Sequence, residues 1–325
     1  DEASVQIAVR FLNIRILGLP FLYVYQMRNA LLVGTNQSRY LILGTATEAF
    51  VNIFFDYGLI YGKMGMPALG FDGAAYASII AEFAGLAVIF IVIHVKGISK
   101  QLHLFKSWGY DAVNTKLILK QSSPLILQHT ISITSWEFFY ILIEHHGEQA
   151  LAISNTMRNI FGFFGCFTWA FAATANTMVS NIIGQNRHHH VIELIHKLIR
   201  WSVGFAVLVC VFLNIFPHAF LSIYGQGEDF IQAAIPVMRV VSIALVLMSV
   251  SVIWLNAVTG TGNSKMNLAT ETAAIILYCI YNYIVLEKLN LSIIWGWASE
   301  GIYWATLLIP SFWYMQSGRW KTRKI

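Results

Sequence analysis

Charged residues are scarce in this chain: Asp, Glu, Lys and Arg make up only 11% of its 325 residues, and hydrophobic residues make up 57%. A soluble domain carries roughly 25% charged residues, so this composition excludes an ordinary water-soluble fold. The three cysteines stand singly in apolar runs, without metal or redox spacing. The sequence also lacks a phosphate-binding glycine loop, an HExxH helix and a nucleophile elbow, so we expect no enzymatic activity.

Long apolar runs, in contrast, follow one another through most of the chain. About 20 apolar residues cross the hydrocarbon core of a bilayer as a helix, whereas the strands of a membrane barrel are short and alternate in polarity. The runs therefore predict an all-α membrane protein. We expect nine transmembrane helices, near residues 5–33, 40–61, 71–95, 117–143, 150–183, 193–224, 230–259, 267–287 and 291–316.

The net charge of +5 is distributed unevenly over the loops. Most Lys and Arg residues fall at one end of the predicted helices, together with the basic C-terminal tail, and the opposite end receives chiefly Lys63 and Lys288. Cytoplasmic loops carry an excess of positive charge, so we expect a multi-pass protein of the plasma (inner) membrane with a cytoplasmic C-terminus. The basic residues form no patch, so the pattern does not favour nucleic-acid binding.

Two parts of the chain resemble each other at an offset of 226 residues. LLVGTNQSRY (31–40) aligns with AVTGTGNSKM (257–266), and FDGAAYAS (71–78) aligns, two residues later in register, with SEGIYWAT (299–306). Chance matching of short motifs is the alternative. Because the matches stay collinear over three spans, we interpret them as an internal duplication. The last three spans then repeat the first three in the same orientation.

The duplication predicts a twelve-helix, two-lobed protein whose first three helices are absent from this chain, since the middle three spans have no counterpart upstream. Residues 1–95 are then the second half of the N-terminal lobe. Residues 96–116, which are polar and rich in Lys, form a cytoplasmic linker between the lobes. Residues 117–316 form the C-terminal lobe of six helices, and residues 317–325 form a basic cytoplasmic tail.

A polar stripe interrupts the second apolar run. In EAFVNIFFDYG (48–58), Glu48, Asn52 and Asp56 recur every fourth residue and share one helix face. A charge at the centre of a membrane helix costs about 2.5–3.5 kcal/mol, so these carboxylates must face a wet cavity, pair or bind a proton. The stripe predicts a coupling site for H⁺ or Na⁺, with a stripe that holds helices together as the alternative.

The duplication locates this coupling in the first lobe. It aligns Asp56 with Asn282 and Glu48 with Ala274, so the second copy keeps a polar face without these acids. We expect a substrate cavity in the second lobe instead, lined by Gln128, Ser132, Trp136, Asn155 and Asn282. Aromatic residues there could stack on a flat cation, although aromatic runs more often pack against lipid or core.

Three stretches resemble the multidrug and toxic compound extrusion (MATE) family: RILGLPFLYVYQMRNALLVGTNQSR (15–39), EAFVNIFFDYGLIYG with PALGFDGAAYAS (48–78), and NTMVSNIIGQNR (176–187). The resemblance implies twelve helices in two lobes and export of organic cations in exchange for H⁺ or Na⁺. Asn52 and Asp56 resemble the N-x-x-x-D pair of the family's first-lobe cation site. One branch of the family has a glutamate eight residues after the proline of the seventh helix, where this chain has Ser132.

These observations together predict a secondary active multidrug efflux transporter for organic cations and other xenobiotics. We expect no cofactor other than the coupling ion, H⁺ or Na⁺, and no metal other than transient Na⁺ at Asp56 and Asn52. We expect a monomer that contacts membrane lipid and binds no nucleic acid. The alternatives are a lipid-linked oligosaccharide flippase of the same superfamily, which needs a cationic cavity, and an inactive truncated membrane protein.

Overall fold

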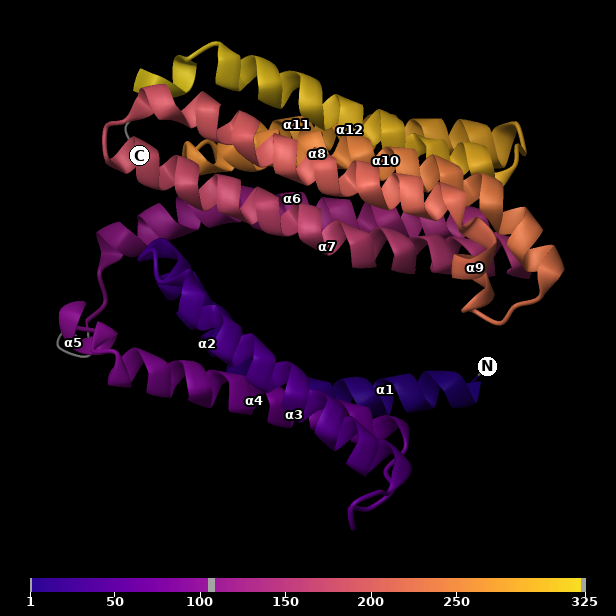
Figure 1. Cartoon of the computed structure of the whole chain (residues 1–325), viewed down its shortest axis with the longest axis horizontal. Coiled ribbons are helices and arrows are strands. Elements are labelled where there is room, and N and C mark those ends of the chain that lie inside the picture. Colours follow the sequence, from indigo (N-terminus) through magenta and orange to yellow (C-terminus); the bar gives the residue numbers. More distant parts are fainter. Residues whose placement is uncertain (1, 105–108, 323–325) are drawn as a thin grey trace. The chain divides into compact units, whose positions relative to one another are not determined.

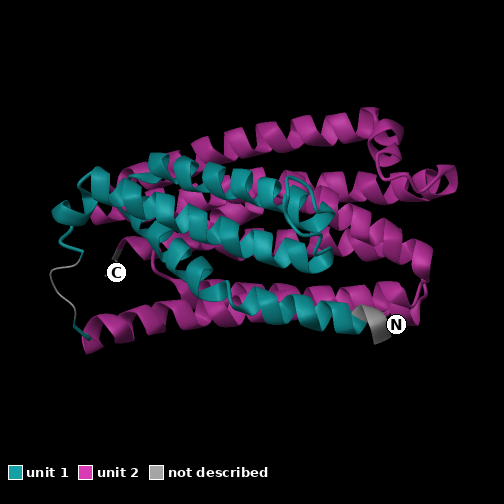
Figure 2. Cartoon of the chain, turned by 90° about the horizontal axis from the view of Figure 1, so that it is seen from below, with its two compact units in different colours: residues 1–110 teal, residues 111–325 magenta. Residues whose placement is uncertain are grey.

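The computed structural model of this chain describes residues 2–104 and 109–322, and within those ranges all regular secondary structure is helical. The predicted all-α class is therefore confirmed. The chain divides into two compact units, residues 1–110 and residues 111–325 (Figure 2). The division falls inside the segment 96–116 that we predicted as a linker. Residues 105–108 of that segment and 323–325 of the predicted tail lie outside the described residues.

The first unit is built around one central helix (Figure 1). Its elements are α1 (Glu2–Ile16), α2 (Leu19–Gly34), the 3-10 turn η1 (Ser38–Tyr40), α3 (Leu41–Tyr61), α4 (Phe71–Val95) and the short α5 (Ile98–Gln101). Helix α4 packs against α1, α2 and α3. Its buried Ile89 and Ile93 meet Tyr25 and Leu32 of α2 in a small apolar core.

Small residues allow α3 and α4 to approach closely. A Cβ atom on Gly73 would lie 2.6 Å from the backbone oxygen of Leu59, and Ala75, Ala77 and Ala81 of α4 are buried. Membrane helices associate through such small residues because lipid offers no hydrophobic drive for their contact. This contact holds the polar stripe of α3 beside α4.

The first predicted span is broken. Helices α1 and α2 form a pair bent by 53° at Leu17 and Gly18. Pro20 lies in the first turn of α2, where its missing N–H costs no helical hydrogen bond. The break therefore follows from the Gly18-Leu19-Pro20 sequence rather than from a loss of hydrophobicity.

The second unit contains the remaining helices (Figure 1). They are α6 (Ala112–Glu144), α7 (Glu148–Gly184), η2 (His188–His190), α8 (Val191–Ile215), α9 (Pro217–Ser222), α10 (Glu228–Gly260), α11 (Ser264–Asn282), the π-helical η3 (Tyr283–Lys288), α12 (Ile293–Gln316) and η4 (Arg319–Thr322). Helix α10 contacts α7, α8 and α12, and α11 packs against α6 and α12.

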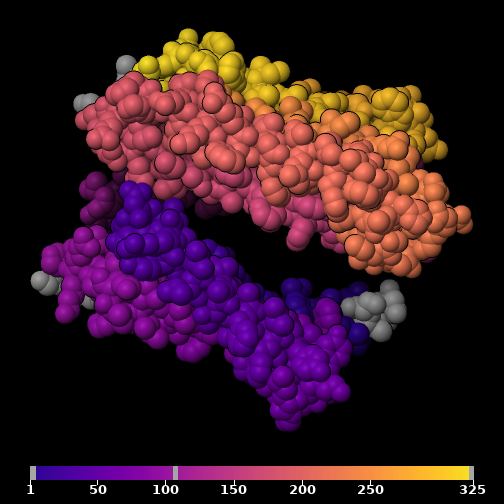
Figure 3. Space-filling view, in the orientation of Figure 1, coloured from indigo at the N-terminus to yellow at the C-terminus, as the bar shows by residue number. Residues whose placement is uncertain are grey.

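Helix α10 forms the core of this unit. Val237, Val241, Met248, Ile253 and Val258 are all buried along it. In space-filling view, the side chains of α8 to α10 (salmon to orange) and those of α12 (yellow) form one continuous surface of the second unit (Figure 3). Large apolar side chains such as Trp201, Leu208 and Ile309 are exposed, as lipid-facing residues of a membrane helix are.

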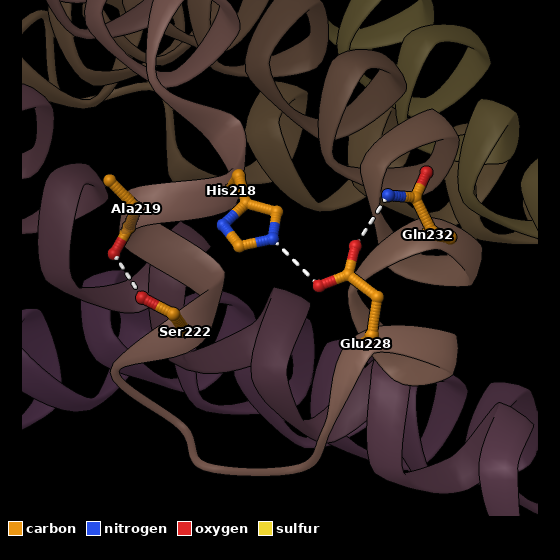
Figure 4. A network of polar contacts seen from close by, with 5 residues as sticks. All are labelled: His218, Ala219, Ser222, Glu228 and Gln232. Carbon is orange, nitrogen blue, oxygen red and sulfur yellow. Dashed lines mark hydrogen bonds and ion pairs between the residues drawn. The ribbon is translucent and has the colours of Figure 1, made fainter.

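A polar network ties α9 to the start of α10 (Figure 4). Glu228 Oε2 lies 2.8 Å from His218 Nε2, and Gln232 Nε2 donates to Glu228 Oε1 at 2.7 Å. The Ser222 hydroxyl donates to the Ala219 carbonyl at 2.9 Å and closes the preceding turn. All three bonds are exposed, so this end of the unit is built for contact with water.

The helical segments follow the nine predicted spans closely. Within the described residues, four helical segments are long and apolar enough to cross a membrane, namely Phe71–Val95, His188–Ile215, Glu228–Gly260 and Ser264–Lys288. The bent pair Val5–Ile16 and Leu19–Gly34 makes a fifth if it is one span. The count of nine spans stays a prediction, because the other helices do not meet this criterion.

Candidate functional site

The second unit encloses a cavity of about 480 Å³ between α6, α7, α10, α11 and α12. This volume is in the range of pockets that hold drug-sized ligands. Gln128, Ser132 and Trp136, which we predicted as cavity residues, all line it from α6. They lie on successive turns after Pro124, so helical periodicity directs them to one side.

Two buried carboxylates also line this cavity. Glu271 of α11 and Glu300 of α12 are each only 3% exposed. The Tyr303 hydroxyl donates to Glu271 Oε1, and Trp304 Nε1 donates to Glu300 Oε2 at 3.0 Å. Because Tyr303 follows Glu300 by about one turn of α12, the two carboxylates lie on neighbouring helices at a similar level of the cavity.

Glu271 was not predicted from the internal repeat, because only the positions that align with Glu48, Asn52 and Asp56 were considered. Glu271 lies three residues before Ala274, the counterpart of Glu48. The structure places it in the same cavity lining as Gln128 and Ser132. The second unit therefore does carry acids within its cavity. The signal available from the sequence was a lone Glu in the apolar run of α11.

Aromatic rings form much of the cavity wall. Trp136 stacks on Tyr140 at 5.9 Å between ring centroids and meets Trp297 edge-on at 6.2 Å. Phe161 stacks near Trp304 at 6.5 Å. The Arg158 guanidinium, the one arginine of the lining, lies 5.1 Å from the centroid of the Tyr140 ring. The wall thus offers π faces to a flat or cationic ligand.

Asn155 and Asn282 are not among the residues that line the cavity. Asn155 is half-buried on α7. Asn282, at the end of α11, is fully buried, and neither its amide nitrogen nor its amide oxygen has a hydrogen-bond partner in the described part of the chain. It follows Tyr278 by one turn, and the hydroxyl of Tyr278 is likewise buried without a partner.

In the first unit, Glu48 and Asn52 line a separate pocket of about 380 Å³. Arg15 of α1 and Glu82 of α4 line the same pocket. Asp56 does not line it, although Asp56 lies on the same helix one turn beyond Asn52. Its Oδ1 atom is buried, and none of the described residues donates a hydrogen bond to it.

Arg15 and Glu82 form a two-fold ion pair across this pocket. Arg15 Nη1 donates to Glu82 Oε2 at 2.9 Å, and Nη2 donates to Oε1. A second pair joins Arg10 Nε to Asp72 Oδ2 at 2.7 Å. Among the described residues no salt bridge reaches Glu48 or Asp56, so the stripe retains two carboxylates that a cation could bind.

The ion pair packs directly on the break between α1 and α2. A Cβ atom on Gly18 would lie 2.7 Å from Arg15 Nη1 and 2.9 Å from Glu82 Oε2. Such distances are shorter than ordinary contacts, so a methyl group at this position would have to push the ends of the Arg15 and Glu82 side chains aside. The pocket and the bend are therefore one structural feature. Sequence reasoning did not identify it, because Arg15 and Glu82 are 67 residues apart.

A resident metal centre is not a feature of the described residues, among which no group of three or more His, Cys, Asp or Glu side chains could hold a metal ion. The His188–His190 run forms a 3-10 turn and is exposed or half-buried. The site therefore consists of two separate polar cavities, one in each unit. Each of them carries carboxylates.

Comparison with known proteins gives a consistent set of relatives. The sequence model of the MatE family matches residues 124–284. A probable multidrug resistance protein NorM of Thermotoga maritima is 23% identical over 98% of this chain and 68% of its own length. The uncharacterized transporter YisQ of Bacillus subtilis is 24% identical over 76% of this chain and 54% of its own length. The chain thus spans about half to two thirds of the length of these relatives.

Solved structures share the fold. A crystal structure of a MATE protein in the straight conformation covers 98% of this chain with a TM-score of 0.84 at 16% identity, and the match covers 72% of that chain. A multidrug resistance MATE family transporter of the MOP superfamily, in an outward-facing conformation, gives 0.84 at 16% identity over 97% of this chain and 70% of its own. At this identity the likeness shows the fold alone.

Proposed function

This chain belongs to the multidrug and toxic compound extrusion family and is a multi-pass membrane protein, and we propose that it exports organic cations in exchange for H⁺ or Na⁺. Its relatives are named as multidrug resistance proteins and transporters, and the proposal extends this function to the present chain. Secondary transporters of this kind bind substrate and coupling ion at polar sites within the membrane and expose them alternately to each side.

The observation that carries the proposal is the character of the cavity in the second unit. It has the volume of a drug-sized ligand, aromatic walls and two buried carboxylates against one arginine. A buried carboxylate is costly unless a cation or a proton accompanies it. A hydrophobic organic cation satisfies both the aromatic wall and the charge.

We assign ion coupling to the first unit. Glu48 and Asp56 form no salt bridge with Arg or Lys among the described residues, and Asn52 between them adds an amide oxygen. Carboxylate and amide oxygens suit a proton or Na⁺. In this proposal Asp56 takes up the ion, Asn52 assists and Glu48 modulates. The bend beside Gly18 adjoins the pocket that Glu48 and Asn52 line, so it offers an element that ion binding on α3 can shift.

The flippase alternative receives less support from the same geometry. A lipid-linked pyrophosphate needs several cationic groups around it. The cavity in the second unit presents Arg158 together with two carboxylates instead. The chemistry of the lining therefore favours cationic cargo.

Ethidium efflux from cells that express the chain tests the function. We expect efflux to stop when the coupling gradient is collapsed. Collapsing the proton gradient and the sodium gradient in separate experiments identifies the coupling ion. Asp56→Asn should abolish it, and the matched variant Asp229→Asn, at an exposed position at the start of α10, should not. Full efflux in Asp56→Asn would remove Asp56 from coupling. No efflux in any of the variants, with the chain folded in the membrane, would contradict the transport proposal and favour the inactive alternative.

A further inference from the structure

Helix α8 carries a recess on its exposed side that the proposed transport does not use. The recess measures about 650 Å³, and its lining residues all belong to α8: Glu193, His196, Lys197, Arg200 and Trp201. They recur every three or four residues, so they share one face over the first three turns of the helix. All five side chains are exposed, so a ligand outside the protein can reach them.

The exposed face of α8 changes from charged to apolar at Trp201. Leu208, Val211 and Ile215 continue the same face beyond Trp201, and each of them is at least 50% exposed. Tryptophan is enriched where hydrocarbon meets water, because its ring is apolar and its N–H is polar. The face thus has the order of polarity of a lipid molecule, in which a charged end is followed by an apolar length, here about 22 Å from Arg200 to Ile215.

The recess is positively charged because its one carboxylate already has a partner. Glu193 Oε2 lies 3.3 Å from Nδ1 of His190, one turn earlier. Glu193 is also the only acidic residue between positions 184 and 227. Lys197 and Arg200 form no salt bridge with any residue that the structure describes. Two cations on one exposed face are therefore left for an anionic ligand.

Packing inside the second unit holds the recess in place. The His196 ring meets Trp254 of α10 edge-on at 5.8 Å between centroids, and Trp254 is only 3% exposed. Trp254 in turn meets Phe312 of α12 edge-on at 5.1 Å. On the opposite face of α8, Ile195 and Leu198 belong to the apolar core. The charged face thus stands on a fixed helix and is formed before any ligand arrives.

Further basic residues lie at the same end of the unit. The His188 ring lies 5.9 Å from the Trp320 ring of η4, so the start of α8 neighbours the C-terminal turn. Lys321 of that turn and Arg187, just before η2, are both exposed. We predict that this end is cytoplasmic, where anionic lipids attract basic residues next to the membrane.

We propose that the recess binds the headgroup of an anionic phospholipid, with Lys197 and Arg200 on its phosphate and Trp201 at the boundary of the hydrocarbon. A guanidinium bonds two phosphate oxygens in parallel, and an ammonium adds a point charge. The acyl chains lie along the exposed apolar face between Leu208 and Ile215. A free phosphate would have no use for that face, so the geometry favours the lipid.

The first test compares two lipids that differ only in headgroup charge. We would add phosphatidylglycerol or phosphatidylcholine with identical acyl chains to the purified chain in neutral detergent micelles. Native mass spectrometry then gives an apparent dissociation constant for each lipid. We expect phosphatidylglycerol to bind at least about fivefold more tightly, which is the effect of one positive charge at a membrane surface. Equal affinities would overturn the proposal.

The double variant Lys197→Gln/Arg200→Gln separates this recess from the general positive charge of the chain. We expect it to weaken phosphatidylglycerol by about tenfold or more and to leave phosphatidylcholine unchanged. The matched control is Lys116→Gln/Lys120→Gln on α6, which removes two exposed charges that do not line the recess. This control should bind phosphatidylglycerol like the unmodified chain. Equal losses in the two double variants would overturn the proposal.

Inorganic phosphate and Trp201→Ala distinguish a lipid from a free anion. We expect excess phosphate to leave phosphatidylglycerol bound and Trp201→Ala to weaken its binding severalfold. Displacement by phosphate together with unchanged binding in Trp201→Ala would show that the recess holds a free anion, and the proposal would be wrong. The substituted side chains are exposed, so these variants remove no core packing. The proposal is independent of transport, because lipid binding is measured without a gradient or a substrate.

Discussion

The first span of the first unit and α10 of the second unit occupy matching positions in the internal duplication and yet differ in shape. Helices α1 and α2 extend from Glu2 to Gly34, and α10 extends from Glu228 to Gly260, so both ends are displaced by the same 226 residues. The first span bends by 53°, whereas α10 is one continuous helix. The matching boundaries support the interpretation of the repeat as a duplication.

The local sequence at the bend explains the difference. Gly18-Leu19-Pro20 of the first span matches Ala244-Leu245-Val246 of α10. Glycine and proline permit a helix break, whereas alanine and valine continue the helix. Helix α10 contains Pro236 without a break, and it is held by α7, α8 and α12. A duplicated span can therefore become a straight core helix or a bent span by a few substitutions.

The charges at the bend differ in the same way. Arg15 matches the buried Val241, and Glu82 matches Pro310 of α12, so the second unit has no ion pair at this place. In the first unit the pair fills the space beside Gly18. Where the first span bends, polar contacts thus stand at the positions that hold apolar packing along α10.

Glu82→Leu should have the largest effect. The Glu82 side chain is 6% exposed and the Arg15 side chain is 26% exposed, so the variant leaves Arg15 charged and largely buried. Breaking such a pair typically costs about 3–5 kcal/mol. We expect a loss of this order in the free energy of unfolding, measured by reversible unfolding in mixed detergent micelles.

The double variant Arg15→Leu/Glu82→Leu is the control for this effect. Replacing both charges by apolar groups removes the uncompensated charge, so it should recover most of the lost stability. If Glu82→Leu unfolds like the unmodified chain, the pair contributes nothing to the bend. If the double variant is as unstable as the single one, loss of packing rather than charge is responsible.

Val246→Pro would transfer the proline of the bend to the straight helix. It removes a backbone hydrogen bond to the Ser242 carbonyl and places the proline ring against it, at a cost of about 3 kcal/mol. We expect a comparable fall in the free energy of unfolding of the whole chain. Val246→Ala is the matched control and should cost much less. If Val246→Pro leaves the free energy of unfolding unchanged, α10 can also accommodate a bend.

Gly18→Ala tests the contact between the bend and the ion pair. The added methyl group would lie within 3.0 Å of Arg15 Nη1 and Glu82 Oε2, so the pair must move. Overpacking of this kind costs about 1–3 kcal/mol. Gly204→Ala on α8, where no other group lies within 4 Å of the added Cβ, is the control and should not destabilise. Equal stability of the two variants would mean that the pair does not need the glycine.

The sequence predicted the helices and part of each polar cavity, because both depend on local periodicity. The four-residue spacing on α3 brought Glu48 and Asn52 into one pocket, and the spacing on α6 did the same for Gln128, Ser132 and Trp136. The role of Asp56 in coupling stays a prediction. Glu82 and Glu271 were missed because each is a single acid in an apolar run. Their partners, Arg15 and Tyr303, lie on other helices, and no local pattern pairs them.

The smallest effect should come from Gly34→Ala, and its counterpart in the repeat, Gly260, lies in a more crowded place. Gly34 and Gly260 end their helices at matching positions. A Cβ atom on Gly34 meets nothing within 4 Å, whereas on Gly260 it would lie 2.6 Å from the Asn176 backbone oxygen.

Because alanine is a better helix former than glycine, we expect Gly34→Ala to stabilise the chain by up to about 1 kcal/mol. Gly260→Ala should destabilise it by about 1–3 kcal/mol, because a backbone atom of α7 cannot yield easily. The free energies of unfolding of both variants, measured under the same conditions, give the sign of each change in stability. Equal signs would show that the two helix ends have kept the same packing, and the divergence of the repeats would then be confined to the bend.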